Sequence, residues 1–252
     1  MTIVFSGALS NFIVMVSDSA VALDFEKSPR EYTTGPKSYC LPGVGCVTTW
    51  GARDLNQVGS FLDRQRISSE DYSVSDLADL VYQYLTEEYR PCELGLNDMG
   101  YHMAGFDSNG HAHLYHVFWG FDRPKPPSQK QQKYEKYEHI LPPEKNVLLY
   151  NGRNDLADMM VHALLGEVDR GGDIRFDLAT PSGLVYLGDF VARFAAELTP
   201  EVGPPFLVHL ISWRNEISRI VNRSFCPIDR DEVTNKLKTL GYKVQTNQEF
   251  HS

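Results

Sequence analysis

Short apolar runs and turn-forming residues alternate through the first fifty residues of the chain. Residues 1–6 and 12–17 are apolar and flank the turn-prone stretch Gly7-Ala-Leu-Ser-Asn11, which predicts a β-hairpin. A second apolar pair, residues 39–41 and 46–50, is joined across Pro42-Gly43 and predicts another hairpin. Thr2, Asp18 and Lys37 are therefore expected at the beginnings or ends of strands.

Helical spacing follows the two hairpins. One apolar face contains Leu55, Val58 and Leu62, and a second contains Leu77, Leu80, Val81, Tyr84 and Leu85. Ser73 stands three residues before Asp76, a spacing similar to that of a capping box, and Pro91 closes the second helix. The chain thus predicts two amphipathic helices after two hairpins.

Alternation with a period of two returns around residues 101–106 and 112–117, and Asp107-Ser-Asn-Gly110 between them favours a hairpin turn. Three histidines cluster here: His111, His113 and His116. Two histidines separated by one residue share a strand face, yet the neighbouring sequence offers no carboxylate or cysteine to complete a ligand set. We interpret them as ordinary surface or strand-pairing histidines and predict no metal site.

Residues 119–146 interrupt the pattern with a polar, proline-punctuated and locally basic stretch, Arg123 to Glu138. Its simplest interpretation is a solvated surface loop. A segment that docks a partner or another subunit is the functional alternative, because long loops in compact domains often bind.

Ordered patterns resume at residue 147. Residues 147–150 predict a short strand, Asn154 begins a predicted helix that reaches Leu164, a further helix spans residues 187–198, and a strand lies within residues 203–212. Beyond Trp213, residues 215–221 suit either a helix or a strand, and Asp229 to Leu240 has weak helical character. This alternation of paired elements predicts an α+β fold of two stacked antiparallel sheets covered by helices.

Composition excludes several classes of protein. The formal charge of -9 and a pI near 5.4 disfavour a general nucleic-acid binder. Neither a membrane-spanning apolar run nor a secretory signal is evident, so we expect a cytoplasmic protein. Four cysteines are too few and too irregular for a disulfide framework, and we interpret Cys40, Cys46, Cys92 and Cys226 as buried thiols.

Thr2, Asp18-Ser19, Lys37 and Gly51 together resemble the proteasome β-subunit family of N-terminal nucleophile hydrolases. In that family an N-terminal Thr is followed by an Asp-Ser, a Lys and a Gly at similar separations. Residues 73–84 look like the family's second helix, and residues 101–115 look like its central hairpin. The resemblance covers about residues 2 to 213 and points to a bacterial proteasome-like member.

The resemblance implies a four-layer αββα sandwich and a threonine-type hydrolase of peptide or amide bonds, activated by removal of Met1. Thr2 would then be the nucleophile with its own amine as the base. Lys37 would lower the pKa of that amine, Asp18 would orient Lys37, and the backbone N–H of Gly51 would stabilise the oxyanion. No cofactor is implied. The expected domain spans residues 1–214 with the inserted loop at 119–146, and residues 215–252 form a C-terminal extension.

Some supporting positions depart from the family pattern. Asn151-Gly152-Arg153-Asn154 replaces a Gly-Ser-Gly turn, and Thr199-Pro-Glu-Val-Gly203 replaces an Asp and a Ser. Two alternatives therefore stay open: a catalytically silent structural or interaction subunit, and a non-peptidase amidase on the same fold. The resemblance further implies a homo-oligomer, a ring or a stack, that takes a peptide or small amide and binds neither nucleic acid nor membrane. Ring size and any partner ATPase cannot be inferred from the residues.

Overall fold

The computed structural model describes residues 2–22, 32–51, 55–65, 67–68, 70–88, 99–121, 132–141, 147–152 and 177–244. Two five-stranded sheets dominate it. The first sheet has the order β10-β1-β2-β11-β12, with β1 (Ile3–Leu9), β2 (Phe12–Ser17), β10 (Val147–Gly152), β11 (Phe206–Ser212) and β12 (Ile217–Asn222). Every pairing in it is antiparallel.

The second sheet has the order β5-β6-β7-β8-β9 and is also antiparallel. Its strands are β5 (Ser38–Leu41), β6 (Gly45–Gly51), β7 (Met99–Phe106), β8 (Ala112–Phe121) and β9 (Gln132–Ile140). A two-stranded ribbon, β3 (Ala20–Ala22) and β4 (Tyr32–Thr34), connects the two sheets along the chain.

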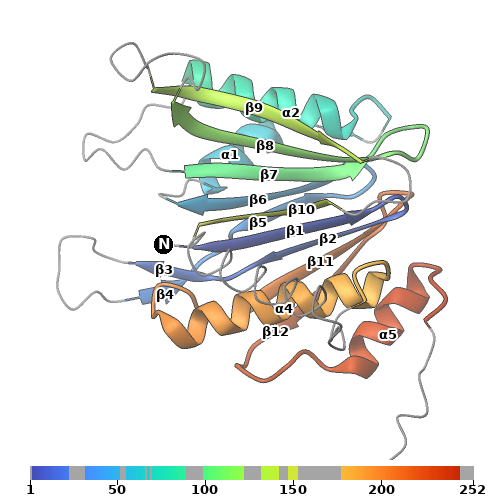
Figure 1. Cartoon of the computed structure of the whole chain (residues 1–252). Coiled ribbons are helices and arrows are strands. Elements are labelled where there is room, and N and C mark those ends of the chain that lie inside the picture. Colours follow the sequence, from blue (N-terminus) through green and yellow to red (C-terminus); the bar gives the residue numbers. More distant parts are fainter. Residues whose placement is uncertain are drawn as a thin grey trace, which may run out of the picture.

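Helices lie on the outer side of each sheet (Figure 1). Helix α4 (Pro181–Leu198) packs on β1, β2 and β11, and α5 (Arg230–Thr239) packs on α4 and β12. On the other side, α2 (Val74–Gln83), which runs into the π-helical turn η1 (Tyr84–Glu88), packs on β7, β8 and β9, and α1 (Leu55–Arg64) packs on β5. None of the helices in the described part of the chain has the length and apolar character needed to cross a membrane.

Burial explains why β1 and β2 are almost continuously apolar. One face of the first sheet packs under α4 and α5 in an apolar cluster that includes Phe5, Val14 and Val208. The other face contributes Ala8, Ile13 and Met15 to a second cluster, shared with Cys46, Ala104 and Leu114 of the second sheet. A strand covered on both faces needs apolar residues at successive positions rather than at alternate ones.

Several predicted elements are confirmed. The hairpins β1–β2, β5–β6 and β7–β8 form as expected, and so do the helices α1, α2, α4 and α5. Ser73 and Asp76 form the predicted capping box at the start of α2. The predicted helix from Asn154 to Leu164 lies outside the described residues, and so does Cys92.

One part of the expected polar loop at 119–146 is a strand. Residues 132–140 form β9, which pairs with β8 at the edge of the second sheet. Its charged residues misled the prediction, because an edge strand with one solvated face tolerates charge and charge discourages edge-to-edge association. The residues expected to form an extension, 215–252, contribute β12 and α5 to the first sheet and its helix layer.

The interpretation of the cysteines as buried thiols was wrong for the three that the structure describes. Cys40 and Cys46 form a disulfide, and Cys226 is exposed. Cys40 faces Cys46 directly across the β5–β6 ladder with the two Cα atoms 4.1 Å apart. Directly opposed residues of an antiparallel pair point to the same face, which is why a separation of six positions in the sequence still brings the sulfurs together.

Candidate functional site

A buried ion pair joins two of the predicted site residues. Asp18 follows the last residue of β2, and Lys37 directly precedes β5. The Nζ of Lys37 lies 2.9 Å from Oδ1 and 2.8 Å from Oδ2 of Asp18. Both side chains are buried, with 0% of Asp18 and 2% of Lys37 exposed. The pair therefore links the first sheet to the second away from solvent.

The Asp18 carboxylate also accepts three backbone N–H groups. Ile3 donates to Oδ1 at 3.1 Å, and Ala20 and Gly203 donate to Oδ2 at 3.0 and 3.4 Å. Burial raises the pKa of the Asp18 carboxyl, while the Lys37 ammonium and the N–H groups of Ile3 and Ala20 act in the opposite direction. Asp18 is thus the point where the start of β1, the ribbon and the segment before β11 meet.

Thr2 is the residue before Ile3, whose backbone N–H donates to the Asp18 carboxylate. This hydrogen bond holds the backbone next to Thr2 close to Asp18. Only 3% of Thr2 is exposed. On its other side the Thr2 carbonyl packs against Gly152, where a Cβ atom would come within 1.7 Å of the Thr2 oxygen. The backbone of Thr2 is therefore fixed by Asp18 through Ile3 and by the close approach of β10.

Gly152→Ala tests this packing. Gly152 has φ +103°, so alanine there combines unfavourable backbone geometry with the collision against Thr2. We expect a loss of about 1–3 kcal/mol in the free energy of unfolding, measured by urea denaturation. Gly110→Ala is the matched control, because Gly110 has φ +80° and no atom near the added methyl group. Equal losses in the two variants would show that Gly152 does not position Thr2.

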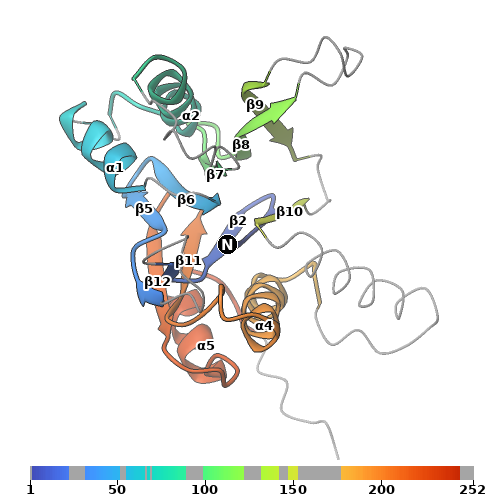
Figure 2. The same cartoon turned by 90° about the vertical axis from the view of Figure 1, so that its left-hand side faces the viewer.

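Gly51 is the last residue of β6, opposite Met99, and has φ +84°. Figures 1 and 2 both place the end of β6 beside the start of β1, where Thr2 lies. Two residues earlier on the same strand, the Thr49 N–H donates to the Lys37 carbonyl oxygen at 2.9 Å. The fold thus brings Thr2, Asp18, Lys37 and the end of β6 to one side of the molecule.

The positions that depart from the family pattern have structural partners of their own. Asn151 Oδ1 lies 2.7 Å from Nε2 of His102, and Thr199 Oγ1 accepts the Glu201 N–H in the turn that ends α4. From the same turn, Gly203 reaches Asp18. The segment 199–203 therefore supports Asp18 through a backbone group rather than through the side chains of Thr199 or Glu201.

The histidines 111, 113 and 116 have different environments. His111 is 74% exposed and contacts Asp107, and His113 Nδ1 lies 2.6 Å from Glu138 Oε1. The expectation that no carboxylate lies near them was wrong for two of the three. His111 contacts Asp107 of the preceding turn, and β9 brings Glu138 to His113 on β8. His116 is buried, and its Nε2 accepts a hydrogen bond from the Trp50 Nε1–H at 3.3 Å.

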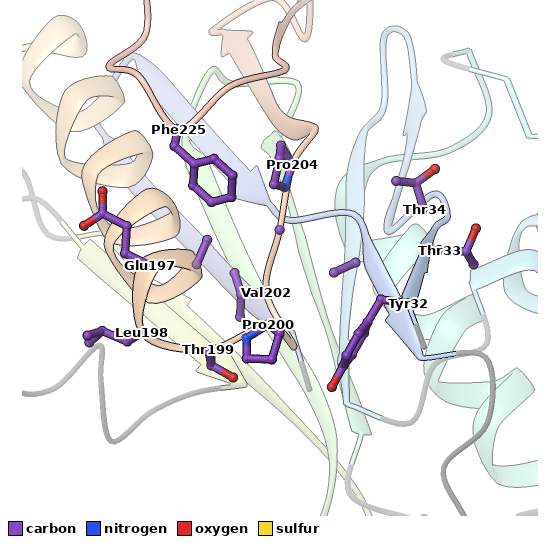
Figure 3. A pocket seen from close by; sticks show the side chains of 13 residues that line it. Tyr32, Thr33, Thr34, Glu197, Leu198, Thr199, Pro200, Val202, Pro204 and Phe225 are labelled. Carbon is purple, nitrogen blue, oxygen red and sulfur yellow. The ribbon is translucent and has the colours of Figure 1, made fainter. Parts of the chain in front are cut away.

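A cavity of about 520 Å³ lies next to the supports of Asp18. It is bounded by the ribbon β3–β4 on one side and by the end of α4 with Phe225 on the other, as Figure 3 shows for Tyr32 and Phe225. Ala20 and Gly203, which both donate to Asp18, line it. Thr2, Asp18, Lys37 and Gly51 are not among the residues that line it.

Sequence reasoning missed the backbone groups that hold the site together. Ile3, Gly152 and Gly203 act through main-chain atoms, which carry no residue-type signal. The one available hint was Gly152 in a turn-like Asn-Gly pair directly after an apolar strand. The side chains of Asp18 and Lys37, in contrast, carry a residue-type signal, and both were predicted as site residues.

Comparison with solved structures shows that the fold is similar to that of Anbu proteins. The chain is similar to Anbu (ancestral beta-subunit) from Yersinia bercovieri, with 14% identity, a TM-score of 0.58 and coverage of 95% of this chain and 92% of that one. An Anbu (Gly-1) mutant from Hyphomicrobium sp. strain MC1 gives 11% identity, a TM-score of 0.57 and coverage of 96% and 95%. A helical assembly of the Anbu complex from Pseudomonas aeruginosa gives 14% identity, a TM-score of 0.56 and coverage of 95% of this chain and 92% of that one.

These likenesses correct the assignment made from the sequence. Assignment to the proteasome β-subunit family of N-terminal nucleophile hydrolases was wrong, because the similar solved structures are Anbu proteins, which are proteasome-like but distinct from that family. No protein-family model and no curated protein matches the chain. At identities of 10–14% the similarity shows the fold alone.

Proposed function

We propose that this chain is a threonine-type amide hydrolase with the Anbu fold, in a four-layer αββα arrangement, and that removal of Met1 frees Thr2 as its nucleophile. The observation that carries the proposal is the buried Asp18–Lys37 pair, whose carboxylate also holds the N–H of the residue after Thr2. Peptides or small amides are the substrates, and the protein acts in the cytoplasm.

The proposed reaction follows from the groups around Thr2. The Thr2 hydroxyl oxygen attacks the substrate carbonyl carbon, and the free amine of Thr2 takes the hydroxyl proton. The C–N bond then breaks, that proton passes to the leaving amine, and the acyl group remains on Thr2 as an ester. Water hydrolyses the ester and restores Thr2.

Lys37 and Asp18 have separate roles in this scheme. The positive charge of Lys37 disfavours a second positive charge close by, so it lowers the pKa of the Thr2 amine and keeps that amine able to accept a proton. Asp18 fixes the ammonium through two contacts of 2.8–2.9 Å. The Gly51 N–H at the end of β6 is the proposed donor to the oxyanion.

The first test is the intact mass of the full-length protein together with covalent labelling. We expect a mass lower by one methionine and an ester adduct on Thr2 after treatment with a β-lactone, an acylating reagent that a nucleophilic hydroxyl opens. Thr2→Ala should abolish the adduct, Thr2→Ser should retain it, and Thr34→Ala on the exposed β4 should leave it unchanged. Retention of Met1, or labelling that survives in Thr2→Ala, would contradict the proposal.

One observation favours a catalytically silent subunit as the second candidate. Thr2 is 3% exposed, and the cavity beside Asp18 does not reach it. A silent subunit would retain the ion pair for its contribution to the fold. It would form no β-lactone adduct even when Met1 has been removed. A non-peptidase amidase would instead form the adduct and cleave small amides but not peptides.

Self-association is the remaining part of the proposal. One of the similar solved structures is described as a helical assembly of the Anbu complex, which concerns that protein. By analogy we propose that this chain forms a homo-oligomer. Light scattering of the purified protein at micromolar concentration should then give a mass above the 28.5 kDa of one chain, and a strictly monomeric protein would refute the analogy.

A further inference from the structure

Two cysteines and a histidine converge between the sheets. Cys40 on β5 and Cys46 on β6 form the disulfide described above, and His209 reaches them from β11 of the first sheet. Nδ1 of His209 lies 3.3 Å from Sγ of Cys40. The three potential ligand atoms all lie within 4.8 Å of one another.

The surroundings of this cluster suit a bound metal ion. Cys46 and His209 are buried, with 0% and 4% exposed, whereas Cys40 is half-buried and leaves a path from solvent. Apolar residues of the inter-sheet core lie around it, including Met15, which pairs with His209 across β2 and β11. Such a shell limits the access of water and strengthens the attraction between a cation and its ligands.

Ser38 fixes the orientation of the histidine ring. Its Oγ lies 2.7 Å from Nε2 of His209, on the side of the ring opposite the sulfurs. When Nε2–H donates to Ser38, the lone pair of Nδ1 points to the cysteine side. Metal-binding histidines commonly have such a partner on the other ring nitrogen, because it sets both the tautomer and the ring orientation.

We propose that, once the disulfide is reduced, Cys40, Cys46 and His209 bind one Zn²⁺ ion. This site is separate from Thr2 and does not depend on the proposed hydrolase activity. Two thiolates and one imidazole form a Cys₂His set, and a water molecule completes the tetrahedron. The two thiolate charges offset the charge of the ion, which an apolar interior requires.

The redox step balances with a dithiol as the reductant. The dithiol supplies two electrons and two protons, becomes a disulfide itself, and converts the Cys40–Cys46 bond into two thiols. Zn²⁺ then displaces the two thiol protons when it binds. Tetrahedral zinc ligands at about 2.0–2.3 Å from the ion lie roughly 3.3–3.8 Å from one another, so the sulfurs must separate before the ion enters. Disulfide and metal are therefore mutually exclusive at this site.

This arrangement was not visible in the sequence. Cys40 and Cys46 form a Cys-x5-Cys pair with no second cysteine pair to complete a zinc site, and both were interpreted as buried thiols. The third ligand lies 163 positions beyond Cys46, on a strand that joins the cluster only when the two sheets pack face to face. The local sequence around His209 is that of an ordinary buried strand, apart from the histidine itself.

Metal titration of the full chain tests the proposal. A Cys92→Ser/Cys226→Ser background leaves only the two site cysteines, and a phosphine keeps them reduced. We expect one equivalent of Zn²⁺ per chain by elemental analysis, and with Co²⁺ as a probe we expect a thiolate-to-cobalt charge-transfer band. The same protein with its disulfide intact should bind neither ion, and this oxidised form is the first control.

Variants then assign the ligands. His209→Asn or Cys46→Ala should weaken Zn²⁺ binding by more than about 100-fold, and Ser38→Ala, which removes only the orienting partner, by roughly 10-fold. His111→Asn, at an exposed histidine, should leave binding unchanged. Circular dichroism of each variant checks that it folds. If His209→Asn does not fold, the comparison of Ser38→Ala with the oxidised protein still tests the site.

Two results would overturn the site. One is a reduced, folded protein that takes up well under one equivalent of Zn²⁺. The other is Zn²⁺ binding that does not depend on these ligands. It would be seen as one equivalent of Zn²⁺ in the oxidised form, or as folded Ser38→Ala and His209→Asn variants that bind Zn²⁺ as tightly as the parent protein, since the ion would then have other ligands.

Discussion

Lys37→Met is expected to lower the free energy of unfolding by about 3–5 kcal/mol. The substitution keeps an unbranched side chain of similar length but leaves the Asp18 carboxylate buried at 0% exposure without its cation. Uncompensated buried charge costs far more than the pair itself contributes. Urea denaturation at pH 7 measures the change.

A double-substitution cycle separates the missing charge from the missing contacts. Asp18→Asn combined with Lys37→Met removes both charges, and we expect the double variant to lose less stability than the sum of the two single variants. Lys136→Met is the matched control, because Lys136 pairs with the 61% exposed Asp79 on the outer surface. That variant should lose less than about 1 kcal/mol.

The pH dependence of Lys37→Met gives an independent check. Burial already raises the pKa of Asp18, and loss of the ammonium removes the largest opposing effect. An acid whose pKa is higher in the folded than in the unfolded chain binds more protons when folded, so its unfavourable effect on stability shrinks as the pH falls. The stability deficit of Lys37→Met should therefore narrow between neutral and acidic pH. A deficit that is small at pH 7, or that widens in acid, would show that Asp18 is not held as a buried carboxylate.

Local patterns predicted most of the helices and hairpins of this fold. The α2 helix could be placed from its apolar spacing and its Ser73–Asp76 cap, and the β7–β8 turn from Asn109-Gly110, because these signals act over a few residues. The strand β9 could not be predicted in this way. Its residues are mostly polar, and they form a strand because they pair with the neighbouring β8. Its sequence resembles a solvated loop until the partner strand is known.

The candidate site divides in the same way. Asp18 and Lys37 were predicted because their spacing with Thr2 and Gly51 resembles that of a known family, and the structure joins them. The cluster of Cys40, Cys46 and His209 required the packing of two sheets, which no spacing within the chain encodes. Roles that depend on main-chain atoms, such as those of Ile3 and Gly152, were also beyond prediction.

We expect a buried histidine between the sheets to make the stability of the protein sensitive to mild acid. His102 of β7 lies 2.9 Å from Ser6 Oγ through Nδ1 and 2.7 Å from Asn151 Oδ1 through Nε2. The neutral ring satisfies both partners, since Nε2–H donates to Asn151 and Nδ1 accepts from the Ser6 hydroxyl. Burial, with a smaller effect of His139, lowers the pKa of His102 to about 4.

This depressed pKa fixes the direction of the pH effect. Between about pH 6.5 and pH 4 the histidine binds a proton in the unfolded chain but not in the folded one. The stabilisation is therefore fully present above pH 6.5 and is lost as the pH falls toward 4, by about 3 kcal/mol in total. We expect the free energy of unfolding, measured in urea, to fall by about 2–3 kcal/mol more between pH 7 and pH 4.5 in the parent protein than in His102→Gln.

His102→Gln should itself be less stable at pH 7, because glutamine reproduces the contact with Asn151 but leaves Ser6 without its acceptor. The decisive quantity is the change with pH and not the stability at one pH. His111→Gln, at a 74% exposed position, is the matched control for a histidine substitution outside the core. If His102→Gln kept the pH profile of the parent protein, the pKa of His102 would not differ between the folded and the unfolded chain. The folded protein would then take up the proton at the ordinary pKa of a histidine, and the hydrogen bonds that cross from β1 through β7 to β10 would have to rearrange around a ring with two donors.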